Sequence, residues 1–270
     1  MEKILLPTTI EFEDADKENV GKIVVTPCHQ GYGTTLGNAL RRVLLSSLPG
    51  SAVESIKIKG VQHEFSAING VLEDVIQIIL NIKQMAVKSH SAEPIVLNLV
   101  KKGIGEVTAA DFEKNADVEI INKDLKIATI TDKDYTFDLE VIINQGRGYV
   151  PVGEKDTKNL DLGTIAIDSL YTPIRDVGYK VENTRVGDVT DYEKLTLNIE
   201  TNGTITPKDA IAQTTKILMD HFTLILDATG SASGSGDLEE INMEVEESDG
   251  DKKKEKKEKK AKKKTAKKTK

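Results

Sequence analysis

The chain has 270 residues, of which 38% are hydrophobic and 30% are charged, and its formal net charge at pH 7 is -7. This composition suits one or two packed domains and excludes a collagen, a disulfide scaffold and a wholly disordered chain. No apolar run reaches the roughly 20 residues of a membrane helix, and residues 1–7 lack the hydrophobic region of a secretory signal. The single cysteine, Cys28, is typical of a reducing compartment. We therefore expect a cytoplasmic protein.

Strand patterns dominate, and helical patterns are few. Apolar and β-branched residues predict strands near 22–26, 53–59, 95–99, 120–131, 135–143, 177–186 and 195–199. Helical spacing appears instead at about 34–47, 70–85 and 206–228. We expect Asn69 to be the N-cap of the second helix and Thr206 that of the third, which should end at Gly230. This mixture predicts an α+β fold.

The first predicted helix has two contrasting faces. Its apolar stripe consists of Leu36, Ala39, Leu40, Val43, Leu44, Ser47 and Leu48. The opposite face carries Asn38, Arg41, Arg42 and Leu45, so that a large aliphatic side chain lies beside two arginines. This pattern indicates contacts on both sides of the helix, although one exposed leucine on a monomer surface is an equal explanation. The wide apolar arc of the third helix also suggests two neighbours, one of which can be another chain.

A glycine-rich segment, residues 31–37, opens the first helix. Its spacing is one residue longer than G-x-G-x-x-G, and no Gly-Lys-Ser/Thr follows, so we favour a structural role over phosphate binding. We expect Gly31 and Gly33 to form the turn into the helix, and Gly37 to let another backbone approach closely.

No set of residues has the spacing of an active site or a metal site. Cys28 adjoins His29, but His63, His90 and His221 offer no second ligand at metal spacing. A nucleophilic Cys28 would also need a base and an orienting group, and the sequence identifies neither. We therefore predict no catalytic residue, no metal and no cofactor in this chain.

Opposite charges are concentrated at the C-terminal end. Residues 237–249 contain seven acids and no base, whereas residues 251–270 contain 13 lysines and three acids. We expect residues 231–270 to be a disordered linker, acidic stretch and Lys-rich tail. Nonspecific contact with DNA would use the lysines of this tail, Lys252, Lys253, Lys254, Lys256 and Lys257. A purely solubilising tail is the alternative.

A family resemblance is carried by residues 31–50, which read GYGTTLGNALRRVLLSSLPG. Further matching stretches follow in the same order at 60–65, 70–74, 79–83, 103–111, 146–151, 171–173, 181–186 and 200–205. Together they strongly resemble the family of bacterial RNA polymerase alpha subunits over about residues 15 to 230. Residues 231–270 do not match the carboxy-terminal domain of that family, which binds upstream promoter DNA.

The resemblance implies a two-subdomain amino-terminal fold. A discontinuous dimerisation subdomain is expected at 1–49 and 177–230, with an inserted β-rich subdomain at 50–176. The chain would be a non-catalytic subunit of a nucleotidyltransferase, a homodimeric scaffold that nucleates assembly of beta and beta-prime for transcription. The catalytic magnesium is expected in beta-prime, and omega and sigma join the holoenzyme. DNA would be reached only through the assembled enzyme or weakly through the tail, no membrane is involved, and the location would be cytoplasmic and nucleoid-associated.

The resemblance also implies roles for individual residues. Dimerisation is assigned to Leu36, Gly37, Ala39, Leu40, Val43, Leu44, Leu218, Phe222 and Ile225. Docking of beta and beta-prime is assigned to Asn38, Arg41, Arg42, Leu45, Lys83 and Ile167, with Arg42 on beta and the last two on beta-prime.

Two other functions are compatible with parts of the sequence. The chain could be a stand-alone homodimeric nucleic-acid-binding protein that uses its Lys-rich tail. A small-molecule enzyme is a third alternative, but it requires a polar pocket with convergent titratable groups, and the sequence shows no such set.

Overall fold

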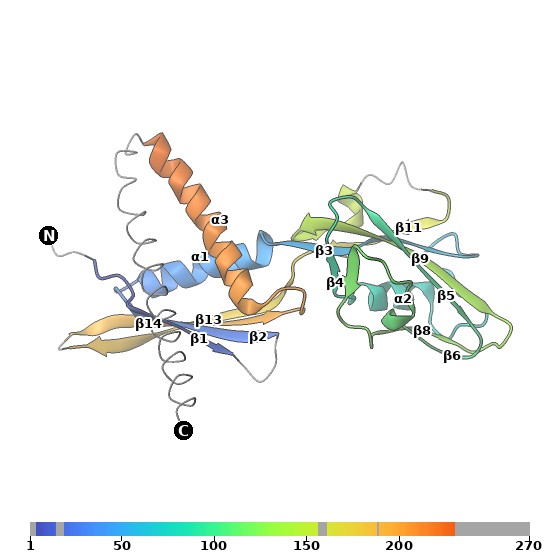
Figure 1. Ribbon diagram of the computed structural model, residues 1–270, viewed down its shortest axis with the longest axis horizontal. Coiled ribbons are helices and arrows are strands. Elements are labelled where there is room, and N and C mark those ends of the chain that lie inside the picture. Colours follow the sequence, from blue (N-terminus) through green and yellow to red (C-terminus); the bar gives the residue numbers. More distant parts are fainter. Residues whose placement is uncertain (1–3, 15–18, 156–160, 188, 230–270) are drawn as a thin grey trace, which may run out of the picture. The chain divides into compact units, whose positions relative to one another are not determined.

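The computed structural model describes residues 4–14, 19–155, 161–187 and 189–229. Among these residues, strands outnumber helices, and the helices are α1 (Tyr32–Ser46), α2 (Val75–Ile82) and α3 (Pro207–Ala228) (Figure 1). Two short 3-10 turns, Ala109–Asp111 and Val152–Glu154, follow strand ends. The prediction of a mixed α+β fold is therefore confirmed.

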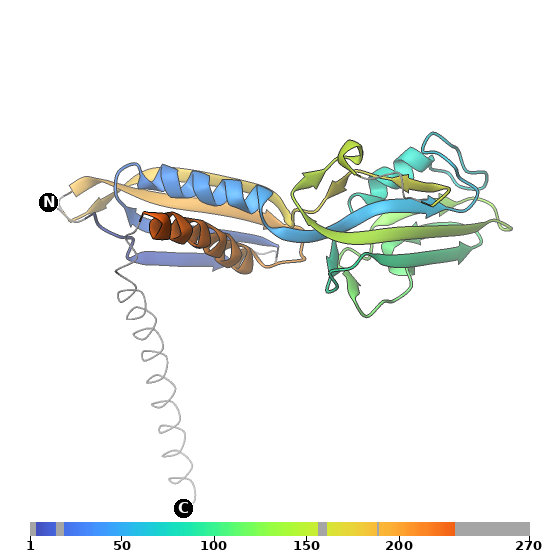
Figure 2. The ribbon, with the colours of Figure 1, turned by 90° about the horizontal axis from the view of Figure 1, so that it is seen from above.

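The first sheet combines strands from both ends of the described chain. Its order is β1-β2-β14-β13, and all neighbours are antiparallel. The strands are β1 (Thr9–Asp14), β2 (Val20–Cys28), β13 (Ile174–Val186) and β14 (Val189–Thr201). Helix α1 lies along β13 and β14 (Figure 2). Between helix and sheet is a hydrophobic core that includes Ile23, Val25, Leu44, Leu195 and Leu197, which we call the helix-side core.

The second large sheet is built from residues between Pro49 and Ala166. Its strands run in the order β5-β9-β3-β4-β7, and β11 also pairs with β3. They are β3 (Pro49–Ile58), β4 (Val87–Ser89), β5 (Ile95–Lys102), β7 (Val118–Ile120), β9 (Thr136–Arg147) and β11 (Thr164–Ala166). Two small ladders accompany it, β6 (Gly105–Thr108) with β8 (Lys126–Ile130), and β10 (Tyr149–Val150) with β12 (Ser169–Leu170).

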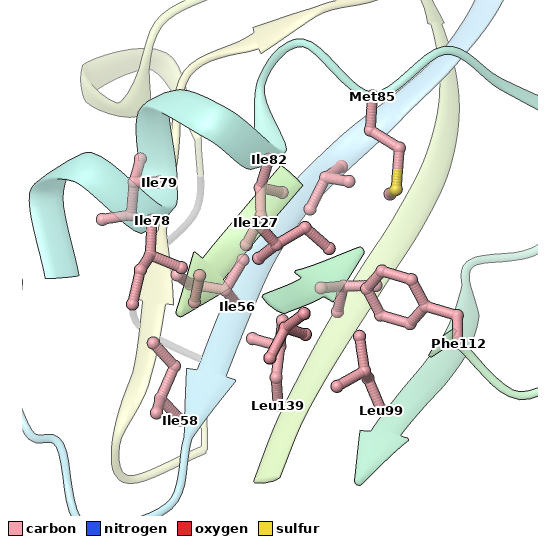
Figure 3. Close-up of a cluster of buried hydrophobic side chains, with 14 of the residues drawn as sticks. Ile56, Ile58, Ile78, Ile79, Ile82, Met85, Leu99, Phe112, Ile127 and Leu139 are labelled. Carbon is pink, nitrogen blue, oxygen red and sulfur yellow. The ribbon is translucent and has the colours of Figure 1, made fainter. Parts of the chain in front are cut away.

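A second hydrophobic core fills this part of the chain. Figure 3 shows isoleucines of α2, such as Ile78 and Ile82, pointing toward Ile56, Ile127 and Leu139 of the strands. The predicted alternation along residues 135–143 is confirmed, because the apolar side chains at 137, 139, 141 and 143 are all fully buried. The helix-side core and this core share no residue.

The second helix is shorter than predicted, and its start was placed wrongly. Helix α2 begins at Val75 with Asp74 as N-cap, whereas Asn69 lies outside the helix and is exposed. The residues before it follow β8 instead, because Val71 bridges Ile130 and the Leu72 N–H donates to the Thr129 carbonyl at 2.9 Å. A pairing partner at a distance in the sequence therefore overrides local helical spacing.

The ends of the other two helices agree closely with their signals. Helix α1 begins two residues earlier than predicted, at Tyr32. Thr206 caps α3 as predicted, since its Oγ1 accepts a hydrogen bond from the Asp209 N–H at 3.1 Å. Gly230 lies outside the described residues. The chain divides within α3 into two compact units, one that ends at Ile217 and one that begins at Leu218. The predicted subdomain boundaries stay a prediction.

Candidate interaction surfaces

The glycine-rich turn before α1 binds a carboxylate of the same chain. The Gly31 N–H donates to Glu193 Oε1 and the Gly33 N–H donates to Glu193 Oε2, both at 2.9 Å. Gly31 has a φ of 84°, which side chains rarely adopt, so glycine is required in this turn. A helix N-terminus favours negative charge, and Glu193 supplies it here. The geometry supports the structural interpretation of residues 31–37 over phosphate binding.

Gly37 faces a side chain and not another backbone. A Cβ atom at this position would lie 2.7 Å from Cδ2 of Tyr179 and 3.0 Å from Cδ1 of Leu195. The expectation that Gly37 admits another backbone was therefore wrong, because the ring of Tyr179 on β13 occupies that space. Glycine at this position brings α1 close to its own sheet.

The residues predicted for dimerisation on α1 fall into two groups. Gly37 and Leu44 are buried against the sheet of their own chain, and Leu44 is 0% exposed. Because their surfaces are covered within their own chain, this burial does not support a direct contact with a second chain, and the assignment stays a prediction. Leu36 is exposed, and Ala39, Leu40 and Val43 are half-buried, so these four side chains reach the surface along one edge of the helix.

The opposite face of α1 is exposed along its length. Asn38, Arg41, Arg42 and Leu45 all lie at the surface, as the helical spacing predicts. Within the described ranges neither arginine forms an ion pair. Two unpaired guanidinium groups beside an exposed leucine combine charge with apolar area, a combination common at protein interfaces. We call Asn38, Arg41, Arg42 and Leu45 the outer α1 face.

Lys83 occupies the C-terminal end of α2 and forms an ion pair. Its Nζ lies 2.8 Å from Oδ2 of Asp168, and Asp168 Oδ1 accepts the N–H of Val152 at 2.9 Å. The hydrogen bond from Lys83, with that from Val152, lowers the pKa of Asp168 to about 2. The Lys83 side chain is 30% exposed, so it is held in place yet remains accessible.

Ile167 does not lie at the surface. Its side chain is 3% exposed and belongs to the same core as α2, while its N–H donates to the Glu54 carbonyl at 3.1 Å. This burial does not support a direct docking contact of the Ile167 side chain, and its assignment stays a prediction. Ile167 lies between the short strands β11 and β12, and isoleucine is often fully buried, whereas the neighbouring Asp168 reaches the surface.

Lys155 has a structural role that the sequence analysis missed. Its Nζ donates hydrogen bonds to the Glu54 carbonyl at 3.1 Å, the Ile167 carbonyl at 2.5 Å and Ser169 Oγ at 2.6 Å. Burial lowers the pKa of Lys155. The lysine thereby ties the segment from Ile167 to Ser169 onto β3. No local pattern identifies it, because its three acceptors are remote from it in the sequence.

The second half of α3 carries a row of exposed apolar side chains. Leu218 is half-buried, and the exposed residues are Met219 (54%), Phe222 (63%), Leu224 (69%), Ile225 (61%) and Leu226 (53%). A helix that is apolar on more than one side normally packs against another polypeptide. Phe222 and Ile225 are among the residues predicted for dimerisation.

Among the described residues, neither the cysteine nor any group of His, Asp and Glu side chains has the surroundings of a reactive nucleophile or a metal site. Cys28 is 1% exposed, and burial raises the pKa of its thiol, which keeps it protonated. In the part of the chain that the structure describes, no three His, Cys, Asp or Glu side chains are grouped to hold a metal. A surface pocket of about 700 Å³ has only Lys88 and Asp209 as titratable lining residues. These observations give no support to the small-molecule enzyme alternative.

Two further findings concern the membrane and the tail. Over the described residues, none of the helices combines the length and apolar character needed to cross a bilayer. The candidate DNA contacts at Lys252, Lys253, Lys254, Lys256 and Lys257 lie outside the described residues, as does the whole predicted linker and tail, 231–270.

Comparison with known proteins gives consistent matches. Residues 56–172 match the family described as the RNA polymerase Rpb3/RpoA insert domain. The chain is 48% identical over 254 residues to the DNA-directed RNA polymerase subunit alpha of Symbiobacterium thermophilum, a match that covers 94% of this chain and 78% of the relative. It is 49% identical over 235 residues to the subunit of the same name from Clostridium botulinum strain Hall, covering 87% of this chain and 73% of the relative.

Proposed function

Because the chain belongs to the family of bacterial DNA-directed RNA polymerase alpha subunits, we propose that two copies of it form the scaffold on which beta and beta-prime assemble. The outer α1 face carries this proposal. Its arginines have no ion-pair partner within the described ranges, and its leucine is exposed at 36%. A face that combines these groups on a rigid helix is suited to capture a larger polypeptide.

The dimer contact would use a different surface. The exposed edge of α1, made of Leu36, Ala39, Leu40 and Val43, and the apolar second half of α3 both have uncovered area. An isologous dimer buries the same patch on both chains. The surfaces of α1 and α3 in each chain would therefore be sufficient to form the dimer contact. Both helices of the proposed dimer contact belong to the proposed dimerisation subdomain of residues 1–49 and 177–230, and neither belongs to the proposed insert of residues 50–176.

The second docking contact would use Lys83. Its ion pair with Asp168 holds the side chain at the end of α2, and Lys155 holds the segment that carries Asp168. In this arrangement beta-prime would meet a preorganised charged pair. Ile167 contributes through the core beneath this pair.

The chain would contribute no catalytic residue to the nucleotidyltransferase. Three of its ionised groups, Glu193, Asp168 and Lys155, engage in structural contacts, and the catalytic magnesium would lie in beta-prime. Omega and sigma would join the same assembly in the cytoplasm, at the nucleoid. The Lys-rich tail would add a weak, salt-dependent contact with DNA.

Substitution of Arg42 tests the proposal. The Arg42→Ala chain should dimerise normally, because Arg42 lies on the outer α1 face, but recovery of co-expressed beta should fall by at least about fivefold, equivalent to about 1 kcal/mol. Arg175→Ala is the matched control, since Arg175 is an exposed arginine on β13. Size-exclusion chromatography with light scattering reports the dimer, and affinity capture reports beta. Normal beta recovery with Arg42→Ala would contradict the docking assignment.

A further inference from the structure

The outer α1 face carries positive charge that is not neutralised nearby. Helix α1 contains Arg41 and Arg42 and no acid, and in the part of the chain that the structure describes neither arginine forms an ion pair. A third exposed arginine, Arg147, lies at the end of β9, beside the last turn of α1, because a Cβ on Gly148 would be 3.4 Å from the Ser46 carbonyl oxygen. This surface is suited to an acidic partner that also carries apolar side chains.

The chain itself contains a segment with these properties. Residues 237–249, the acidic stretch, read DLEEINMEVEESD. They combine seven acids and no base with the apolar residues Leu238, Ile241, Met243 and Val245. The acidic stretch lies outside the described residues, and the proposed scaffold role gives it no task. Its composition is complementary to a surface on which arginines lie beside an exposed leucine.

We infer that the acidic stretch binds the outer α1 face in the free dimer and that beta displaces it on docking. This inference rests on the proposed docking of beta at that face, to which it adds a regulatory step. The arginines would then be paired with carboxylates of the same protein until beta arrives. A face occupied in this way is protected from other anionic polymers, such as nucleic acids, that exposed arginines attract.

The chain is long enough for this contact. Ile211 of α3 and Leu44 of α1 belong to the same helix-side core, and Thr229 is 18 positions after Ile211. At a rise of 1.5 Å per residue, Thr229 is at most about 27 Å from that core, whichever direction the helix takes, and the outer α1 face is about one helix diameter, 10 Å, farther. Residue 243, in the middle of the acidic stretch, is 14 positions beyond Thr229. An extended chain of that length spans about 46 Å, which is sufficient.

The Lys-rich tail is the other positive partner within reach of these acids. Residues 251–270 carry 13 lysines, but their apolar residues are limited to Ala261 and Ala266. The outer α1 face offers guanidinium groups, which bind carboxylates in a bidentate manner, and it adds the apolar side chain of Leu45. It therefore matches both properties of the acidic stretch, whereas the tail matches its charge alone.

Cross-linking in the full chain tests the contact. Leu45→Cys is combined with Ile241→Cys, and mild oxidation should link the two cysteines, whichever copy of the dimer each belongs to, because a disulfide needs Cβ atoms about 4 Å apart. Cys28 does not interfere, since it is 1% exposed. The matched control carries the same two cysteines but has the seven acids of the stretch replaced by their amides, so that both positions and the chain length are unchanged.

The acids should decide the yield of this cross-link. We expect at least about a tenfold higher yield with the acids present, the combined effect of three exposed arginine–carboxylate pairs. The difference should disappear in about 1 M sodium chloride, which screens such pairs. Equal yields at low salt would overturn the inference and would leave the Lys-rich tail as the partner of the acids.

The affinity for beta tests the displacement, in chains without added cysteines. The amide variant should bind beta at least about fivefold more tightly than the unsubstituted chain at low salt, because its outer α1 face is no longer occupied. Amides at Asp251, Glu255 and Glu258, the acids of the Lys-rich tail, are the control and should leave the affinity unchanged. Failure of beta to bind any of these chains would refute the proposed docking function, whereas equal binding to all of them would refute the displacement alone.

Discussion

Glu193 and Gly33 are 160 positions apart in the chain, yet Glu193 Oε2 accepts the N–H of Gly33 at 2.9 Å. The other oxygen of the same carboxylate accepts the N–H of Gly31. The carboxylate of Glu193 on β14 thus holds the N-terminus of α1. This contact aligns α1 on the sheet, so that the outer α1 face points to solvent. The orientation of the proposed docking face depends on this contact.

Removal of the Glu193 carboxylate should destabilise the fold. Glu193→Ala leaves two N–H groups at the helix start without their acceptor, and hydrogen bonds to a charged group contribute about 2 kcal/mol. We expect that loss in the free energy of unfolding, measured with urea, and a smaller loss for Glu193→Gln, which keeps one oxygen. Glu200→Ala, an exposed position on the same strand, should have little effect. A Glu193→Ala chain as stable as Glu200→Ala would refute the role of the carboxylate.

A methyl group at Gly37 should also destabilise the protein. The new Cβ would lie 2.7 Å from the Tyr179 ring, so the ring or the helix must shift. Overpacking of this kind destabilises by about 1–3 kcal/mol, and the higher helix propensity of alanine offsets about 1 kcal/mol of that. Thermal unfolding of Gly37→Ala compared with Gly178→Ala provides the measurement, because a Cβ at Gly178 meets nothing within 4 Å. An unchanged thermal unfolding midpoint for Gly37→Ala would contradict the prediction, because the Tyr179 ring would then have moved aside without a cost in stability.

The ion pair of Asp168 should make stability depend on pH in the acid range. The folded-state pKa of Asp168 is about 2, below the value of about 3.9 for an unfolded aspartate. The stabilisation is therefore fully present above about pH 4 and disappears as the pH falls toward 2. We expect about 1 kcal/mol after screening of this partly exposed pair. Asp168→Asn should lose that amount at pH 7, and the difference from the unsubstituted chain should vanish near pH 2. A difference that does not change with pH would contradict the assignment.

Lys155 should be important for the segment next to the proposed beta-prime contact. Lys155→Met keeps the length of the side chain but removes the donors to the Glu54 and Ile167 carbonyls and to Ser169 Oγ. Unsatisfied buried acceptors cost about 1–3 kcal/mol. We expect this loss in urea unfolding, together with faster hydrogen exchange over residues 164–170. Lys114→Met, at an exposed lysine, is the control. Unchanged exchange in Lys155→Met would contradict its anchoring role.

The sequence was most informative where one local pattern decides the structure. The alternation over residues 135–143 predicted β9, and the spacing along α1 predicted which residues face outward. Thr206 marked the start of α3 because a cap depends on neighbours within one turn.

Contacts between remote segments account for what the sequence analysis missed. The residues before α2 form hydrogen bonds with β8, and the Gly37 surface contacts Tyr179. Lys155 binds the carbonyls of Glu54 on β3 and of Ile167. The exposure of Ile10 and Phe12 on β1 depends on which helix covers which strand, and that is a property of the whole sheet.

Native mass spectrometry of the complex captured through this chain tests the scaffold role most directly. We predict a species with two copies of this chain, one beta and one beta-prime, and a free pool consisting of dimers. Recovery of the chain as a monomer, without either large subunit, would contradict the account.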